Sequence, residues 1–120
     1  MSARAITLKI SGKAEQAREA AEEAGHLAER LHYPVGEAAA LEALATTAGD
    51  PEECRRQMEE ARELWMGLGR PLDVAICDLL LGHLLAHAEA PDADELLDKS
   101  ATEFERLGVD HLALWARALV

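Results

Sequence analysis

The feature that most constrains the fold of this chain is an internal repeat of 37 to 40 residues. The segment 12–16 aligns with 49–53 at an offset of 37, and the segment 65–69 aligns with 104–108 at an offset of 39. At the first offset the identical pairs include Ala24 and Ala61, Leu27 and Leu64, Leu31 and Leu68, and Pro34 and Pro71. Such a period predicts a stack of similar units, each of which buries its apolar face against its neighbours.

Composition and periodicity both favour helices. The chain has 24 Ala and 19 Leu but only 3 Ile, 4 Val and 4 Thr, so helix formers dominate over β-branched residues. In the second copy apolar residues recur every three or four positions, which places them on one helix face: Cys54, Met58, Ala61, Trp65 and Leu68. We predict an all-α fold with helices near 13–32, 36–48, 51–68, 72–88, 91–107 and 110–120.

Glycine, proline and aspartate mark the expected helix ends. Asp50 and Asp110 are expected N-caps, and Gly67 and Gly69 lie where the 51–68 helix should stop. A turn at Ser11-Gly12 would separate residues 3–10 from the first long helix. The 72–88 helix is apolar nearly all round, so it should lie in the middle of the stack. The boundaries predict one domain with a truncated first repeat (1–34), a second repeat (35–71), a third (72–110) and a terminal helix (110–120).

The repeat units resemble tetratricopeptide (TPR) hairpins, whose usual period is 34 residues. The second helix of a TPR carries an Ala-x3-Phe pattern and later a proline, and Ala61-x3-Trp65 followed by Pro71 matches that pattern in kind. Ala24-x3-Ala28 with Pro34 is a weaker match. The resemblance, which covers most of residues 11–120, implies antiparallel hairpins stacked as a short right-handed solenoid.

The second copy is also similar to the longer TPR-like arrays of large bacterial ATP-dependent transcriptional activators of the MalT/LuxR type. It begins with Gly49-Asp50-Pro51-Glu52 and ends at Leu68-Gly69, as their repeats do. This resemblance implies a module of a bacterial signalling or transcription regulator. Because the chain has neither a phosphate-binding Gly-x4-Gly-Lys-Ser/Thr loop nor a basic recognition helix, we expect no ATPase or DNA-binding activity from it.

Charge restricts the partners. The formal net charge is −11, and a surface this acidic repels phosphate backbones and anionic lipids, which argues against nucleic acid and membranes as partners. No apolar run reaches membrane-spanning length, and residues 1–10 do not have the layout of a signal peptide. Cys54 and Cys77 form no disulfide framework, so we expect a reducing, cytoplasmic location.

No catalytic constellation is apparent, and we predict no enzyme activity and no cofactor. Both cysteines lie on apolar stripes, where a buried cysteine usually behaves as a small hydrophobe, which disfavours a nucleophilic role. His83 and His87, at i and i+4, share a helix face and could both bind a metal ion, with Glu89 or Asp73 as a third ligand. The Glu of a His-Glu-x2-His motif is missing. A solvated or groove-lining histidine pair is the simpler interpretation.

The preferred function is a non-catalytic protein-protein interaction or regulatory module. If the first helix of each pair lines a concave face, that face would be acidic and suited to a basic or amphipathic partner helix. Its predicted residues are Glu37, Glu42, Asp73, Asp78, His83 and His87. The alternative is a small-molecule sensor or enzyme-like domain with an enclosed apolar pocket around helix 72–88; a module would have an open groove instead.

Surplus apolar surface suggests association. Two faces are candidates for contact with a second copy or a partner helix. One comprises Val74, Leu81 and Leu85, and the other, on the first repeat, comprises Ala17, Ala20, Ala24 and Leu27. Among the aromatic residues, Trp65, Phe104 and Trp115 are predicted to be core, whereas Tyr33 lies in a turn and is expected to be exposed.

Overall fold

The computed structural model describes the backbone of residues 3–120 and the side chains of residues 13–120. Within that range the chain forms helices and no strands, which confirms the all-α prediction. The helices are α1 (Ala3–Arg30), α2 (Pro34–Thr46), α3 (Pro51–Gly67), α4 (Pro71–His87), α5 (Ala93–Arg106) and α6 (Asp110–Leu119).

The helix boundaries differ from the predicted ones mainly at the N-terminus. The expected turn at Ser11-Gly12 is wrong, because α1 continues through both residues. One glycine costs a helix only about 1 kcal/mol, which the good helix formers around it offset. At α2 the helix begins at Pro34, because proline suits the first helical position. Asp110 is the first residue of α6 rather than its N-cap, which is Val109.

The same tight turn closes three helical hairpins. His32, Gly69 and Gly108 all adopt the left-handed conformation, with φ values of 52°, 68° and 78°. They are separated by 37 and 39 residues, the offsets of the sequence repeat. In each case the next residue donates a backbone hydrogen bond to the carbonyl oxygen five positions back, in the preceding helix: Tyr33 to Ala28 (2.8 Å), Arg70 to Trp65 (3.0 Å) and Val109 to Phe104 (2.8 Å). Each of these turns joins two helices through three residues, so the hairpins are α1–α2, α3–α4 and α5–α6. Glu89, after α4, has a similar geometry (φ of 56°, Ala90 to Leu85 at 3.0 Å), but five residues separate α4 from α5.

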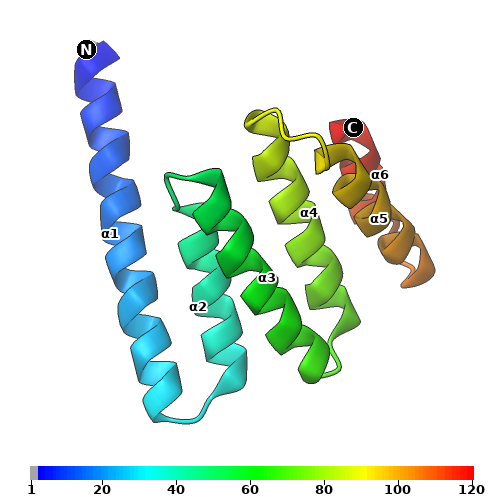
Figure 1. The fold of residues 1–120 in the computed structure, drawn as a ribbon, viewed down its shortest axis with the longest axis horizontal. Helices are drawn as coiled ribbons and strands as arrows, with labels where there is room; N and C mark the ends of the chain where they lie inside the picture. The colour runs from blue at the N-terminus through cyan, green and yellow to red at the C-terminus, as the bar shows by residue number, and fades with distance from the viewer. Residues whose placement is uncertain (1–2) are drawn as a thin grey trace.

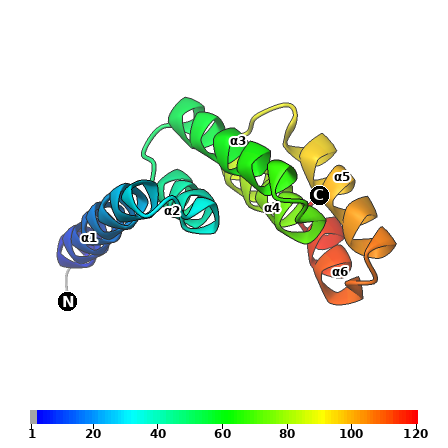
Figure 2. The same ribbon diagram turned by 90° about the horizontal axis from the view of Figure 1, so that it is seen from below.

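The helices pack in chain order. Each helix contacts the next one, and α2 also contacts α4. Figure 1 shows the helices following one another from α1 at one end of the molecule to α5 and α6, which overlap in this view, at the other. Seen at right angles, α3 and α5 lie on one side of the array and α2, α4 and α6 on the other (Figure 2). Open cavities lie between α1 and α3 over α2, and between α3 and α5 over α4.

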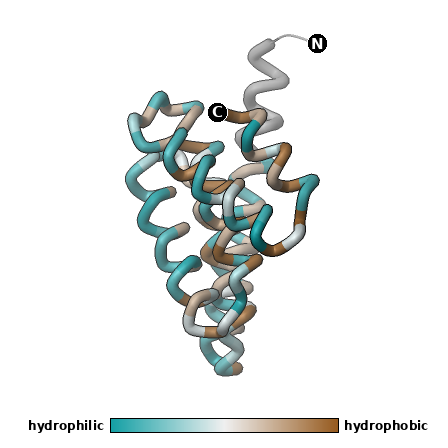
Figure 3. The backbone as a smooth tube through the Cα atoms, turned by 90° about the vertical axis from the view of Figure 1, so that its right-hand side faces the viewer, coloured by the Kyte–Doolittle hydropathy of each residue, from teal (hydrophilic) through white to brown (hydrophobic). Residues whose placement is uncertain are grey.

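Two apolar clusters form the core, and α4 contributes to both. The first includes Met58, Trp65 and Leu81, and the second includes Leu97 and Phe104. Hydrophobic and hydrophilic stretches follow one another along the tubes in Figure 3. Buried residues of α4 belong to both clusters, so this helix is covered on several sides. The central place predicted for this helix is confirmed.

The aromatic predictions are confirmed in three of four cases. Trp65 and Phe104, which are 39 residues apart, are 4% and 0% exposed and occupy equivalent places in the two clusters. Tyr33 is exposed, as expected. Trp115 is not core: it is 47% exposed, because α6 packs into the second cluster through Ala113 and Ala116 instead.

An ion pair also repeats with the fold. Arg18 of α1 contacts Glu53 of α3 at 2.8 Å, and Arg55 of α3 contacts Asp92, just before α5, at 2.7 Å. These two pairs are related by the offsets 37 and 39. The second pair is bidentate, and the hydrogen bond from Arg55 lowers the pKa of Asp92 below its usual value. Equivalent charges therefore link successive odd-numbered helices.

Candidate functional site

We call the groove between α1 and α3, with α2 as its floor, the first groove. It is open to solvent and has a volume of about 380 Å³. Its apolar lining comes mainly from Leu41, Leu44 and Leu64. Four carboxylates surround these leucines: Glu22, Glu29, Glu37 and Glu60. His26 completes the polar rim.

These carboxylates are poorly neutralised within the chain. Glu22 has Arg18 at 3.5 Å, one turn away on α1. Within residues 13–120, Glu29, Glu37 and Glu60 contact no Lys or Arg side chain within ion-pair distance. The first groove thus combines an apolar floor with an uncompensated negative rim.

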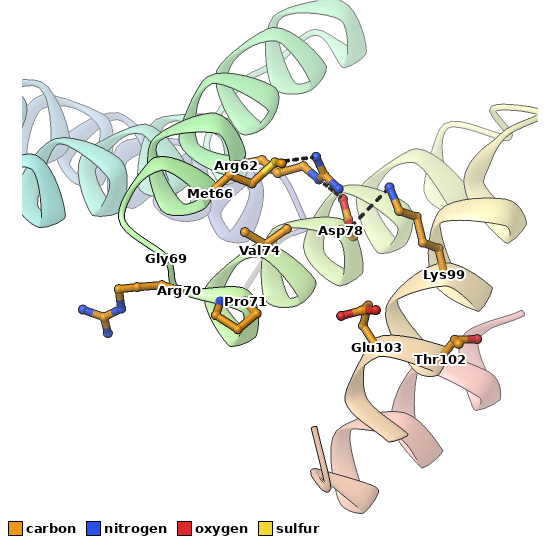
Figure 4. Close-up of a pocket in the computed structure, with 10 residues that line it drawn as sticks. All are labelled: Arg62, Met66, Gly69, Arg70, Pro71, Val74, Asp78, Lys99, Thr102 and Glu103. Atoms are coloured by element: carbon orange, nitrogen blue, oxygen red, sulfur yellow. Dashed lines mark hydrogen bonds and ion pairs between the residues drawn. The ribbon is translucent and has the colours of Figure 1, made fainter. Parts of the chain in front are cut away.

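The second groove lies between α3 and α5, with α4 as its floor. It consists of two adjoining open cavities of about 540 Å³ and 280 Å³ that share Arg62, Asp78 and Lys99. Figure 4 shows the larger cavity, where Arg62 from α3 and Lys99 from α5 both point toward Asp78 of α4. Apolar walls adjoin this group and are formed by Met66, Pro71 and Val74.

The two grooves are copies of one another. Adding 37 to the numbers of the lining residues on α1 and α2, and 39 to those on α3, gives the equivalent positions in the next repeat. Every lining residue of the first groove has such an equivalent in the lining of the second. The charges, however, are not copied. Arg62, Asp78 and Lys99 of the second groove correspond to Gly25, Leu41 and Glu60 of the first.

The group in the second groove centres on a buried carboxylate. The side chain of Asp78 is 3% exposed and accepts a hydrogen bond from Nε of Arg62 at 2.9 Å. Nζ of Lys99 lies 3.9 Å from its other oxygen, beyond hydrogen-bond distance. Nη1 of Arg62 meets only the sulfur of Met66, at 3.2 Å, which is a weak acceptor. Both cations therefore keep donors that can bind a further anion.

A third surface lies between α1 and α2, away from the first groove. It surrounds a cavity of about 370 Å³ lined only by Ala, Leu, Gly and Tyr. Leu27, Leu31 and Tyr33 are 48%, 66% and 55% exposed there. The predicted first-repeat face is exposed in all four of its members: Ala17, Ala20, Ala24 and Leu27. We call this surface the uncharged face.

The acidic residues predicted to share one partner groove are dispersed. Glu37 lines the first groove and Asp78 the second. Glu42 is half-buried and accepts hydrogen bonds from Nε1 of Trp65 (2.7 Å) and Sγ of Cys77 (3.0 Å), so it links α2, α3 and α4. Asp73 pairs with the neighbouring Arg70 at 2.8 Å.

The histidines of the predicted groove lie elsewhere again. His83 and His87 pack edge to face with ring centroids 4.8 Å apart, and His83 lies 6.5 Å from the ring of Trp115 on α6. In the described residues no third His, Cys, Asp or Glu joins them in a group that could hold a metal, so Glu89 and Asp73 are not brought to this pair.

The association face predicted on α4 is wrong in two of its three members. Leu81 and Leu85 are 3% and 2% exposed and belong to the first core cluster, because α2 and α3 both pack over this side of α4. Val74 is half-buried and lines the second groove. Accessible apolar surface lies around the cavity between α1 and α2, and at single side chains of α3, α4 and α6.

Both thiols are unsuited to nucleophilic chemistry. Cys54 and Cys77 are buried, and burial raises the pKa of each thiol above its ordinary value. The hydrogen bond from Cys77 to the Glu42 carboxylate raises the pKa of Cys77 further. Since the thiolate is the reactive form, neither side chain offers an activated nucleophile.

The chain matches no protein-family model, no curated protein and no solved structure. Among the described helices, none is both long enough and apolar enough to cross a bilayer. The class that the fold defines is an all-α array of three helical hairpins packed in sequence.

Two residues of the second groove, Arg62 and Lys99, were missed by sequence reasoning. On its own helix each looks like an ordinary surface charge. The signal that reveals them is a difference between repeats: when the copies are aligned, Arg62 stands opposite Gly25 and Asp78 opposite Leu41. Residues that are identical between the copies are explained by the fold that the copies share. Residues that differ between them are not required by that fold.

Proposed function

We propose that this chain is a non-catalytic protein-interaction module of the TPR-like type that binds a basic amphipathic helix in its first groove. The observation that carries the proposal is the set of four carboxylates, Glu22, Glu29, Glu37 and Glu60, around an apolar floor. The resemblance to arrays of bacterial transcriptional activators supports a regulatory role in the cytoplasm.

The physical chemistry of the first groove selects the partner. An amphipathic helix inserts apolar residues at i, i+3 or i+4, and i+7 into such a groove, where Leu41, Leu44 and Leu64 would contact them. Lys or Arg on the flanks of that helix would then neutralise the glutamates. The net charge of −11 adds long-range attraction for a cationic partner, so association should be fast and sensitive to salt.

The groove's openness favours a macromolecule over an enclosed ligand. A small-molecule sensor surrounds most of its ligand's surface. The first groove, by contrast, is accessible along one side. This is the property that distinguishes a module from a sensor.

A peptide titration tests the proposal. The probe is a synthetic amphipathic helix of Leu and Lys, and its partner probe carries Glu in place of Lys. We expect the Lys peptide alone to bind, and Glu29→Lys with Glu37→Lys to weaken binding at least about tenfold, as the loss of two charge contacts implies. The matched control is the double variant Glu95→Lys with Glu19→Lys, which changes the net charge by the same amount at positions outside the groove. Equal binding of both peptides, or equal loss in both double variants, would contradict the proposal.

A second candidate interaction is self-association through the uncharged face. The exposure of Leu27, Leu31 and Tyr33 around an apolar cavity favours it, because a contact between two copies there brings no charged side chains of the cavity lining together.

A further inference from the structure

We propose that the second groove binds a monocarboxylate attached to an apolar body, with Arg62 and Lys99 holding the carboxylate over Asp78. This site is independent of the helix-binding function proposed for the first groove. It rests on three observations: the free donors of the two cations, the apolar walls beside them, and the absence of this charge group from the equivalent groove.

The fold itself does not require the buried charge. At the position of Asp78 the first groove has Leu41, and α1, α2 and α3 pack there in the same way. Taking a carboxylate out of water is costly, and an apolar residue of similar size usually replaces a buried ion pair without loss of stability. A carboxylate that is 3% exposed therefore has another role, which we assign to fixing Arg62 through its Nε.

The geometry explains how the anion would be bound. With Nε of Arg62 held by Asp78, the opposite edge of the guanidinium, Nη1 and Nη2, is available to a carboxylate in a bidentate arrangement. The Met66 sulfur, which now contacts Nη1 at 3.2 Å, is easily displaced because it is a weak acceptor. Lys99 reaches the same space from the other wall, on α5.

Charge balance favours a single negative charge on the ligand. In the larger cavity, Arg62 and Lys99 together exceed Asp78 by one positive charge, which one carboxylate neutralises; Glu59 and Glu63 line only the smaller cavity. Glu103, also in the lining, is already paired with Arg106 at 2.8 Å. A phosphate dianion would leave excess negative charge next to Asp78 and Glu103. The apolar body would contact Pro71 and Val74 in a cavity of about 540 Å³, which is open like the first groove, so that the ligand would be enclosed only in part.

Calorimetric titration of the whole chain tests the site. The probes are decanoate and an N-acetylated Leu-Val dipeptide with a free C-terminus, each compared with its neutral amide. We expect a carboxylate probe to bind and its amide to bind at least about tenfold more weakly, because a charged hydrogen bond is lost. Tighter binding of decanoate assigns the site to a free amphiphilic acid, and tighter binding of the dipeptide assigns it to a peptide C-terminus. Equal binding of acid and amide, or binding of neither acid, would overturn the proposal.

Variants separate a binding role from a structural one. Lys99→Gln and Arg62→Gln should each weaken binding at least about tenfold, whereas Arg70→Gln should leave it within about twofold. Arg70 is the matched control because it lines the same cavity but pairs with Asp73 and points away from Asp78.

The double variant Arg62→Ala with Asp78→Leu gives the second readout. It removes the buried ion pair and makes the groove resemble its copy, which has Leu41 there. We expect it to unfold at the parent's denaturant midpoint or above, and to bind no carboxylate. A much lower midpoint would show that the ion pair is structural and would overturn the proposal.

Discussion

At the scale of single residues, the three hairpin turns show one conformational requirement met in two ways. Gly69 and Gly108 adopt positive φ without strain, but His32 reaches a φ of 52° with a side chain attached. A β-carbon makes the left-handed conformation less favourable by about 1–2 kcal/mol. The first hairpin therefore carries a local cost that the other two avoid.

We expect His32→Gly to raise the free energy of unfolding by about 1 kcal/mol, because glycine adopts the left-handed conformation without strain. The greater conformational freedom of glycine in the unfolded chain offsets part of this gain. Urea denaturation followed by circular dichroism measures the change. The reverse substitution at the equivalent position, Gly69→Ala, should lower stability by a similar amount. No change in either variant would argue against a shared turn geometry.

Trp65 and Trp115 provide a matched pair for the core. Trp65 is 4% exposed and donates a hydrogen bond to Glu42, so Trp65→Ala should lower the free energy of unfolding by about 3–5 kcal/mol. Trp115 is 47% exposed, so Trp115→Ala should cost well under half as much. Denaturant midpoints give the comparison, and similar losses in the two variants would contradict the assigned core.

At the scale of helices, the contact between α4 and α5 depends on one small residue. A β-carbon added at Gly82 would lie 2.9 Å from Cγ of Leu97, which is fully buried, and 3.3 Å from the carbonyl oxygen of Ala93. The two helices approach this closely because Gly82 has no side chain. This contact also sets the position of α5, and with it Lys99, relative to the floor of the second groove.

We expect Gly82→Ala to lower the free energy of unfolding by about 1–2 kcal/mol, since overpacking outweighs the better helix propensity of alanine. Gly67→Ala is the control, because an added β-carbon there meets nothing within 4 Å. That variant should be neutral or slightly stabilising. Thermal melts of both variants distinguish the effect of packing from that of propensity, and equal melting temperatures would exclude the close approach.

At the scale of the whole molecule, charge and apolar surface act against one another. The net charge of −11 opposes association between copies, whereas Leu27, Leu31 and Tyr33 favour it. Salt screens the repulsion between copies, with a screening length of about 10 Å at 0.1 M, and leaves the apolar attraction intact. The oligomeric state should therefore depend on ionic strength.

We expect sedimentation velocity to show a dimer that is populated more at high salt and high protein concentration. Leu31→Glu, which places a charge on the uncharged face, should return the chain to a monomer at every concentration. Leu114→Glu is the control, because Leu114 is 71% exposed on the distant helix α6. A parent chain that is monomeric under all conditions, or a dimer that persists in Leu31→Glu, would contradict self-association through this face.

The sequence alone determined the features that depend on local preference and period. The repeat offsets placed the hairpin turns and the buried aromatics Trp65 and Phe104, because identical units must close and pack alike. The apolar character of residues 72–88 identified the central helix. Helix ends were predicted less accurately. Ser11-Gly12 does not interrupt α1, because the helix-forming residues around it outweigh the low helix propensity of one glycine.

The tertiary structure alone decided which charged side chains face one another. Periodicity assigns a residue to a helix face but does not say which neighbour covers that face, so Leu81 and Leu85 were expected outside and Trp115 inside. The second groove shows the same limit more clearly. Arg62, Asp78 and Lys99 come from three helices, and only the packing of α3 and α5 across α4 brings their charges within reach of one another.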